Sequence, residues 1–311
     1  MSHNEWAELD GMAQAELVRR GEVTARELVE AAIERIEALN PRLGAVIHRT
    51  YERARSEADE GRVEGPLAGI PFLLKDSGGE QAGEPHLTGM SALKRVSAKA
   101  SEDSAIALHA RRAGLISLGR TNTPELGLLP TTEPEAFGPT RNPWNPDFSA
   151  GGSSGGAGAA VAAGLVPIAH ASDGGGSIRG PATKCGLVGL KPTRGRTSLG
   201  PARGENWSGL ITHLVLTRSV RDTAASLDAL ARPFAGDPYA APASEGRFMD
   251  AMQRDPGPLR IGFVAQAPRD IGLHPDVAQA TNSVASSLES LGHEIEPTQP
   301  ELLEDLEPTM A

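Results

Sequence analysis

The stretch SAGGSSGGAGAAVAAGLVPIAHASDGGGSIRG, residues 149–180, places an apolar run between two glycine-rich segments. The first segment has five glycines in the eight residues from Gly151 to Gly158. A glycine inside a helix or strand costs about 0.5–1 kcal/mol relative to alanine. Glycines at this density beside an apolar run therefore require a specific structural reason.

The second segment, SDGGGSIRG (residues 172–180), follows the run LVPIAHA, whose composition is typical of a strand. Its glycines at 174–176 allow a sharp turn that points successive N–H groups into one cavity, as an oxyanion hole requires. Ser177 follows directly and would present its hydroxyl to that cavity. The chain between Ser153 and Ser177 is long enough for a helix and a strand, which can return it to the same edge of a sheet.

Generic glycine motifs explain these segments less well. GGSSG and GSSGG centre the pattern G-x-S-x-G on Ser153 and Ser154, which is the nucleophile elbow of α/β-hydrolases. An elbow needs a buried strand directly before it, whereas NPWNPDFSA precedes this pair. The sequence also lacks a G-x-G-x-x-G after a strand and a G-x-x-x-x-G-K-[ST], so neither nucleotide-binding motif applies.

A nucleophilic serine needs a base, and the sequence offers two candidates. His170 lies inside the apolar run, where a buried structural histidine is the better interpretation. Lys75 ends the apolar stretch PFLL, so we expect it to be partly desolvated, which lowers the pKa of a lysine. A neutral lysine can act as a general base. Lys75 is therefore the preferred base, and His170 is the alternative.

Composition limits the classes of function. The chain has 311 residues, 39% of them hydrophobic, and a net charge of −10. It has no Lys/Arg-rich run, so we expect neither nucleic acid nor a membrane surface as a partner. The single cysteine, Cys185, excludes an internal disulfide and a cysteine-cluster metal site, and its apolar neighbours predict a buried, inert thiol. The polar N-terminus shows no signal-peptide pattern, so we expect a cytoplasmic protein.

Strand-like and helix-like segments alternate, which predicts an α/β fold with a mixed β-sheet covered by helices. A capping box at Thr24–Glu27 predicts a helix that ends at Asn40-Pro41. The proline-rich stretch 130–148 predicts a long functional loop. The expected organisation along the chain is an N-terminal helical segment (1–60), a catalytic core (61–232), a linker (233–258), and a strand–helix–strand continuation of the same domain (259–311), in which LRIGFV is a buried strand.

Four segments in order resemble the amidase signature family. They are PLAGIPFLLKD, GRTNTPELG, the central block from AGGSSGG to KPTRGR, and TRSVRDTAASLDAL. The resemblance runs from about residue 10 to residue 311. It implies the amidase signature fold and hydrolysis of a carboxamide C–N bond through an acyl-enzyme, without a metal or an organic cofactor.

The resemblance also implies a role for each matching residue. The catalytic unit of the family is Ser–cisSer–Lys, so Ser177 resembles the nucleophile, Ser153 the bridging serine after a cis peptide bond, and Lys75 the base. The glycines around Ser153 would leave room for that bond. The backbone N–H groups of Gly174, Gly175, Gly176 and Ser177 resemble the oxyanion hole. Four further residues match positions that support the site: Ser154, Ser172, Asp173 and Arg179.

Within the family, NTPELG and TTEPEAFGPTRNPWN resemble bacterial amidases, whereas the glutamyl-tRNA amidotransferase A subunit usually reads NMDEFAMG at the first place. We expect a small-molecule amide as substrate and leave a homodimer open. Family members run considerably further than Ala311, so we expect the C-terminal part of the fold to be missing. Two alternatives stay open: a truncated, weakly active or inactive amidase-like protein, and an amidotransferase A-type subunit.

Overall fold

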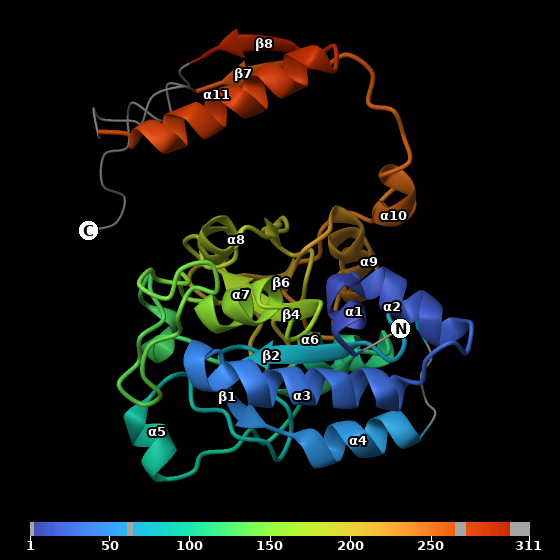
Figure 1. The fold of residues 1–311 in the computed structure, drawn as a ribbon, viewed down its shortest axis with the longest axis vertical. Coiled ribbons are helices and arrows are strands. Elements are labelled where there is room, and N and C mark those ends of the chain that lie inside the picture. The colour runs from blue at the N-terminus through green and yellow to red at the C-terminus, as the bar shows by residue number, and fades with distance from the viewer. Residues whose placement is uncertain (1–2, 61–64, 265–271, 299–311) are drawn as a thin grey trace. The chain divides into compact units, whose positions relative to one another are not determined.

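The protein divides into two compact units, Met1–Met252 and Gln253–Ala311 (Figure 1). The computed structural model describes residues 3–60, 65–264 and 272–298. The expected boundaries near residues 60 and 232 both fall inside the first unit. Residues 61–64 of the expected core, and 265–271 and 299–311 of the expected continuation, lie outside the described residues. That 259–311 continues the same domain stays a prediction.

A mixed sheet forms the centre of the first unit, as the sequence predicts. Its order is β1-β3-β2-β4-β6-β5. Strand β2 runs parallel to both β3 and β4, and the remaining neighbours are antiparallel. The strands are β1 (Val46–Arg49), β2 (Pro71–Lys75), β3 (Ile116–Thr121), β4 (Ile168–Asp173), β5 (Val188–Gly189) and β6 (Thr212–Thr217).

Helices cover this sheet: α3 and α4 pack on the β2–β3 region, α7 on the central strands and α9 on β5 and β6. The helices of the first unit are α1 (His3–Glu8), α2 (Gly11–Arg19), α3 (Ala25–Leu43), α4 (Tyr51–Asp59), α5 (Ser91–Arg95), α6 (Ala105–Arg112), the 3₁₀ turn η1 (Glu125–Gly127), α7 (Gly155–Ala162), α8 (Arg179–Cys185), α9 (Val220–Leu230) and α10 (Phe248–Ala251), which lies in the expected linker.

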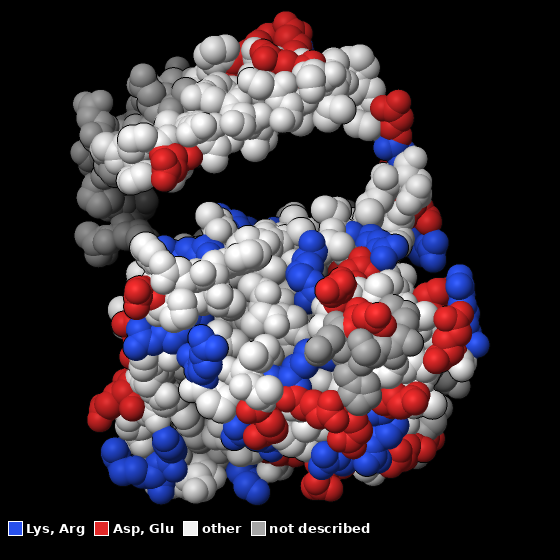
Figure 2. Space-filling view, viewed as in Figure 1, with Lys and Arg blue, Asp and Glu red and all other residues white. Residues whose placement is uncertain are grey.

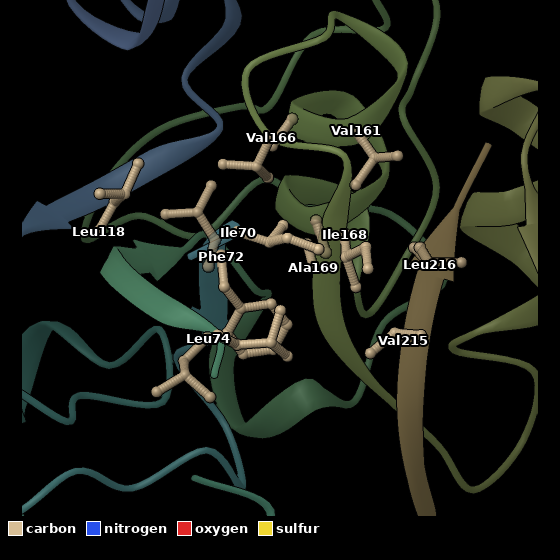
Figure 3. Close-up of a cluster of buried hydrophobic side chains, with 14 of the residues drawn as sticks. Ile70, Phe72, Leu74, Leu118, Val161, Val166, Ile168, Ala169, Val215 and Leu216 are labelled. Atoms are coloured by element: carbon tan, nitrogen blue, oxygen red, sulfur yellow. The ribbon is translucent and has the colours of Figure 1, made fainter. Parts of the chain in front are cut away.

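The core consists of aliphatic side chains between the strands and α7. Figure 3 shows members of this buried cluster, among them Phe72 and Leu74 of β2, Ile168 of β4, Leu216 of β6 and Val161 of α7. These strands are buried along their length, so their sequences are continuous apolar runs without the alternation of a half-exposed strand. The core therefore fixes the ends of β2 and β4, where the candidate catalytic residues lie.

The N-terminal part of the first unit confirms one prediction and corrects another. The Thr24 side chain accepts a hydrogen bond from Glu27 N, and the Glu27 side chain bonds back to Thr24 N, so the capping box is present. The expected end at Asn40-Pro41 is wrong, because α3 continues to Leu43 and ends at the left-handed Gly44. The Asn40 side chain bonds to the backbone of the following residues, which holds this last turn although Pro41 lacks an N–H donor.

The second unit contains β7 (Arg260–Phe263), α11 (Pro275–Ser290) and β8 (Glu294–Pro297), which confirms the expected strand–helix–strand order. The expected burial of β7 is wrong, since its residues alternate between exposed and partly exposed. The strands β7 and β8 form a two-stranded parallel sheet, and one helix cannot cover both faces of such a sheet.

Charged residues of both signs intermingle on the face of the first unit in Figure 2. Some of them join neighbouring helices, as where Arg55 of α4 pairs with Glu30 of α3 at 2.8 Å. Within the described residues, none of the helices combines the length and the apolar composition that a membrane crossing requires.

Candidate active site

Lys75 is the last residue of β2 and its side chain is fully buried. Its Nζ donates hydrogen bonds to Ser153 Oγ at 2.7 Å and to Ser172 Oγ at 2.9 Å. Burial lowers the pKa of Lys75 to about 7, because the ammonium has lost its water, while the charge of Asp173 opposes this shift. The lysine therefore has the position and the reduced proton affinity that the sequence predicts.

Ser153 follows a cis peptide bond with Gly152, as expected, and is buried. A Cβ on Gly152 would lie 2.5 Å from Leu129 O, and one on Gly156 would lie 2.4 Å from Asn122 N. Real Cβ atoms do not approach other atoms so closely. Gly152 and Gly156 are therefore required because the backbone here lies directly against the backbone of neighbouring segments.

Ser154 joins this turn to β4. Its Oγ donates to Ser172 O at 3.3 Å and accepts from Ser172 N at 3.4 Å. Ser172 Oγ in turn accepts from Lys75 Nζ. Ser154 and Ser172 thus lie where the sequence predicts supporting residues, with Ser172 in direct contact with the lysine.

Asp173 closes the turn that carries Ser177. It is fully buried and accepts hydrogen bonds from Gly176 N at 2.8 Å and Ile178 N at 3.1 Å. The Arg179 guanidinium donates to the same carboxylate through two nitrogens, at 3.0 and 2.9 Å. Burial alone would raise the pKa of Asp173, but the Arg179 hydrogen bond and the backbone donors keep that pKa below its ordinary value. The carboxylate is therefore charged and holds the glycine turn in one conformation.

One expected contact is missing. A bridging serine is expected to have Ser153 Oγ within hydrogen-bond reach of Ser177 Oγ as well as of Lys75 Nζ, and no hydrogen bond joins these two described serines, which corrects that expectation. Ser177 is half-buried, and its hydroxyl can rotate about a single bond. Catalytic hydrogen bonds are often long or absent without substrate and tighten when it binds. The structure thus brings Lys75, Ser153 and Ser172 together, and places Ser177 on the adjacent turn.

His170, the alternative base, is confirmed as a buried structural histidine. Its Nδ1 accepts a hydrogen bond from Lys75 N at 3.2 Å, and its Nε2 lies 2.8 Å from His213 Nδ1. Both ring nitrogens therefore have partners, and neither partner is a serine.

Two residues near the site were not identified from the sequence. Thr132 Oγ1 donates to Gly151 O at 2.8 Å and accepts from Gly155 N at 3.2 Å, so it spans the turn that contains Ser153. A Cβ on Gly127 would lie 3.4 Å from Ser153 Oγ. For Thr132 the only signal was the predicted functional loop 130–148, which named no residue, and Gly127 ends the family-like segment GRTNTPELG, which assigned it no role.

Cys185 is buried, as expected, and burial raises the pKa of its thiol to about 12. In the part of the chain that the structure describes, no cluster of three or more His, Cys, Asp or Glu residues is arranged to hold a metal ion.

Comparison with known proteins identifies relatives along most of the chain. A 6-aminohexanoate-cyclic-dimer hydrolase of Paenarthrobacter ureafaciens is 45% identical over 299 residues, which is 95% of this chain and 60% of the relative. A solved structure of 6-aminohexanoate cyclic dimer hydrolase has a TM-score of 0.93 at 44% identity, covering 96% of this chain and 62% of that one. The chain thus spans about three fifths of the length of these relatives.

A bacterial aryl acylamidase of the amidase signature family is more distant, with a TM-score of 0.86 at 34% identity over 94% of this chain and 61% of that one. These relatives confirm the resemblance to bacterial amidases. The sequence profile of the Amidase family matches residues 27–311. By this match and by the identity of its relatives, the chain belongs to the amidase signature family of amidases.

Proposed function

We propose that this chain hydrolyses a carboxamide C–N bond with Ser177 as nucleophile, Ser153 as proton relay and Lys75 as base. The observation that carries the proposal is the buried hydrogen bond of 2.7 Å between Lys75 Nζ and Ser153 Oγ. A lysine with a pKa of about 7 has a large neutral fraction at neutral pH, so it can accept a proton from a serine.

The reaction begins when neutral Lys75 accepts the proton of Ser153 while Ser153 accepts that of Ser177. Ser177 Oγ attacks the amide carbonyl carbon, and the N–H groups of the turn 174–177 stabilise the negative oxygen. The C–N bond breaks as the proton returns to the leaving nitrogen, which departs as an amine and leaves an acyl-enzyme. Water then attacks the ester by the same relay and releases the carboxylic acid. Water is the only co-reactant, so no cofactor is needed.

The substrate class follows from the surroundings of the turn and from the relatives. The ring of Trp207 lies beside Gly174, where an added Cβ would be 3.2 Å from Trp207 Cε3. Trp207 and Leu126, beside Gly127, are about half exposed. Apolar side chains at this place favour a small, largely apolar amide. The names of two relatives, a cyclic-dimer hydrolase and an aryl acylamidase, suggest which amides to assay.

The test combines covalent labelling with a panel of amides. Purified protein is treated with a fluorophosphonate, and the modified residue is identified by mass spectrometry. We expect modification of Ser177, loss of labelling and turnover in Ser177→Ala, and parental activity in the matched control Ser101→Ala, at an exposed serine outside the site. Labelling at Ser154 would overturn the assignment. Failure of the parent to label or to hydrolyse any amide would favour the weakly active or inactive alternative.

A further inference from the structure

Two buried histidines lie behind the candidate base, and the proposed mechanism does not use them. His170 is on β4 and His213 on the neighbouring strand β6, and their exposed fractions are 0% and 5%. Their ring planes are nearly parallel, at 7°, with centroids 5.0 Å apart, and the rings meet edge to edge through a contact of 2.8 Å between His170 Nε2 and His213 Nδ1. We propose that this pair is a positioning device for Lys75: it holds the backbone of the lysine so that Nζ reaches Ser153. This inference rests on the proposed function.

The pair contacts Lys75 where the pairing of β2 with β4 has ended, although Lys75 still pairs with Thr121 of β3 on the other side. The pairing of β2 with β4 covers Phe72 and Leu73. At Lys75 the backbone N–H instead donates to His170 Nδ1 at 3.2 Å. A buried N–H without an acceptor costs about 1–3 kcal/mol, so the imidazole takes the place of a strand carbonyl.

The same strand holds both ends of the lysine. His170 and Ser172 are two residues apart on β4, so their side chains leave the strand on the same face. His170 accepts from the Lys75 backbone, and Ser172 Oγ accepts from Lys75 Nζ at 2.9 Å. On the other side, Arg120 Nη1 donates to Lys75 O at 3.2 Å. The lysine is thus fixed at its N–H, its carbonyl and its amine.

The hydrogen bonds define the proton positions on the pair. Lys75 N is a donor, so His170 Nδ1 must be the acceptor and the proton of the neutral ring is on Nε2. That Nε2–H donates to His213 Nδ1 at 2.8 Å, which places the second proton on His213 Nε2. Burial disfavours the imidazolium and lowers the pKa of both rings, and the nearby charge of Lys75 acts in the same direction. The pair is therefore neutral.

The loop after Lys75 is shaped to accept these rings. A Cβ on Gly78 would lie 2.2 Å from His213 Cε1, and one on Gly79 would lie 2.8 Å from His170 Nδ1. Gly78 also has a φ of +76°, which a larger residue rarely adopts. The glycines of the sequence KDSGG thus make room for the histidine pair, which links two sequence features that the catalytic assignment left unexplained.

The experiment compares three variants for kcat, KM and the rate of fluorophosphonate labelling. His170→Leu keeps a buried side chain but removes the acceptor, whereas His170→Asn keeps an acceptor oxygen near the place of Nδ1. His109→Leu makes the same change in α6, at another buried histidine. We expect His170→Leu to lower kcat and labelling by about 10²-fold with KM little changed, the loss that follows a misplacement of about 1 Å. His170→Asn should restore most of the activity, and His109→Leu should match the parent.

The pH profile distinguishes positioning from mere stability. In His170→Leu, Nζ is no longer held in its dry site, so the pKa of Lys75 should move up from about 7 and the activity limb should shift to higher pH. The charged groups that act on the pair are Lys75, Arg120, Glu80 and Arg203, and all of them are unchanged in this variant. An unshifted profile with parental kcat, or equal loss in the Leu and Asn variants, would overturn the proposal.

A second measurement does not depend on folding of the variants or on activity. Nitrogen-15 NMR of the parent protein reports which ring nitrogens carry protons. It is recorded at pH 7.5, about half a unit above the pKa of Lys75, where most of the lysine is neutral. We expect His170 to be neutral with the proton on Nε2. A proton on Nδ1, or a charged ring, would contradict the positioning role even if the enzyme is active. Absence of Ser177 labelling in the parent would instead reject the proposed function and leave the tautomer to decide this inference.

Discussion

The two halves of the candidate site differ in how tightly the structure holds them. Lys75 and Ser153 are buried, and the lysine is bonded through its amine, its N–H and its carbonyl. Ser177 is half-buried on a glycine turn, and its hydroxyl has no hydrogen bond among the described residues. The proposed base is therefore fixed without substrate, whereas we expect the proposed nucleophile, Ser177, to complete its geometry when substrate binds. A change in the base half should therefore affect proton transfer, and a change in the nucleophile half should affect attack on the carbonyl.

The largest effect should come from removal of the base. In Lys75→Ala we expect kcat/KM to fall by about 10²–10⁴-fold, because the general base is lost. The matched control is Lys99→Ala, at an exposed lysine outside the site, which should leave kcat/KM unchanged. Initial rates with the best amide of the panel measure both. Near-normal turnover in Lys75→Ala would show that another group accepts the proton.

A smaller loss should follow when the nucleophile turn is loosened. Asp173→Asn weakens the acceptor for Gly176 N and removes the charge that pairs with Arg179, so we expect kcat to fall by about tenfold to 10²-fold, less than loss of an oxyanion donor. Asp173 also raises the pKa of Lys75, so the activity limb should shift to lower pH in this variant. Rate profiles over pH check both effects. A shift to higher pH would contradict the comparison, because it would mean that the base half had been disturbed instead.

In the parent protein, the titration of Lys75 should be visible in the pH dependence of both the rate and the free energy of unfolding. The proposed mechanism requires neutral Lys75, so kcat should rise with pH and reach half of its maximum near pH 7. Since the folded pKa is depressed below 10.5, the unfolded chain binds more protons between pH 7 and 10.5, and the contribution of Lys75 makes stability rise with pH in that window. Urea unfolding at several pH values, compared with Lys75→Ala, isolates this contribution. An equal pH dependence in both proteins would contradict it.

The smallest effect on kcat is expected at Cys185, which belongs to neither half of the site. Cys185 is buried, and its thiol has a raised pKa, so it should not react with iodoacetamide in the folded protein. Cys185→Ala should keep kcat within about twofold, because the thiol donates to Ala150 O, which is not one of the proposed catalytic groups. Thiol modification followed by mass spectrometry, before and after unfolding, checks this. Inactivation by the reagent in the folded state would instead place the thiol near the reaction.

The sequence predicted those features that depend on residues close together in the chain. The capping box at Thr24 has a short-range origin, and it was found. The position of Lys75 followed from an apolar strand that ends in a charge. The family resemblance, by contrast, supplied the pairing of Ser153 with Lys75, because no spacing rule connects residues so far apart in the chain.

Features that depend on tertiary contacts were missed. The strand β6 is buried on all sides, so its sequence has no alternation that would mark it. The end of α3 beyond Pro41 depends on bonds from the Asn40 side chain to the next strand. The exposure of β7 depends on which other elements pack against it, and the sequence of the strand alone does not specify them.

One strand, β4, supports both halves of the site. His170 and Ser172 hold the lysine, and Asp173 holds the turn of Ser177, all within four consecutive residues. Because β4 contacts both, we expect a shift of this strand to move the proposed base and the turn of the proposed nucleophile together. Substrate range could then diverge through the surrounding loops without rebuilding the chemistry. A library for altered specificity should therefore keep β4 constant and vary the residues around Leu126 and Trp207.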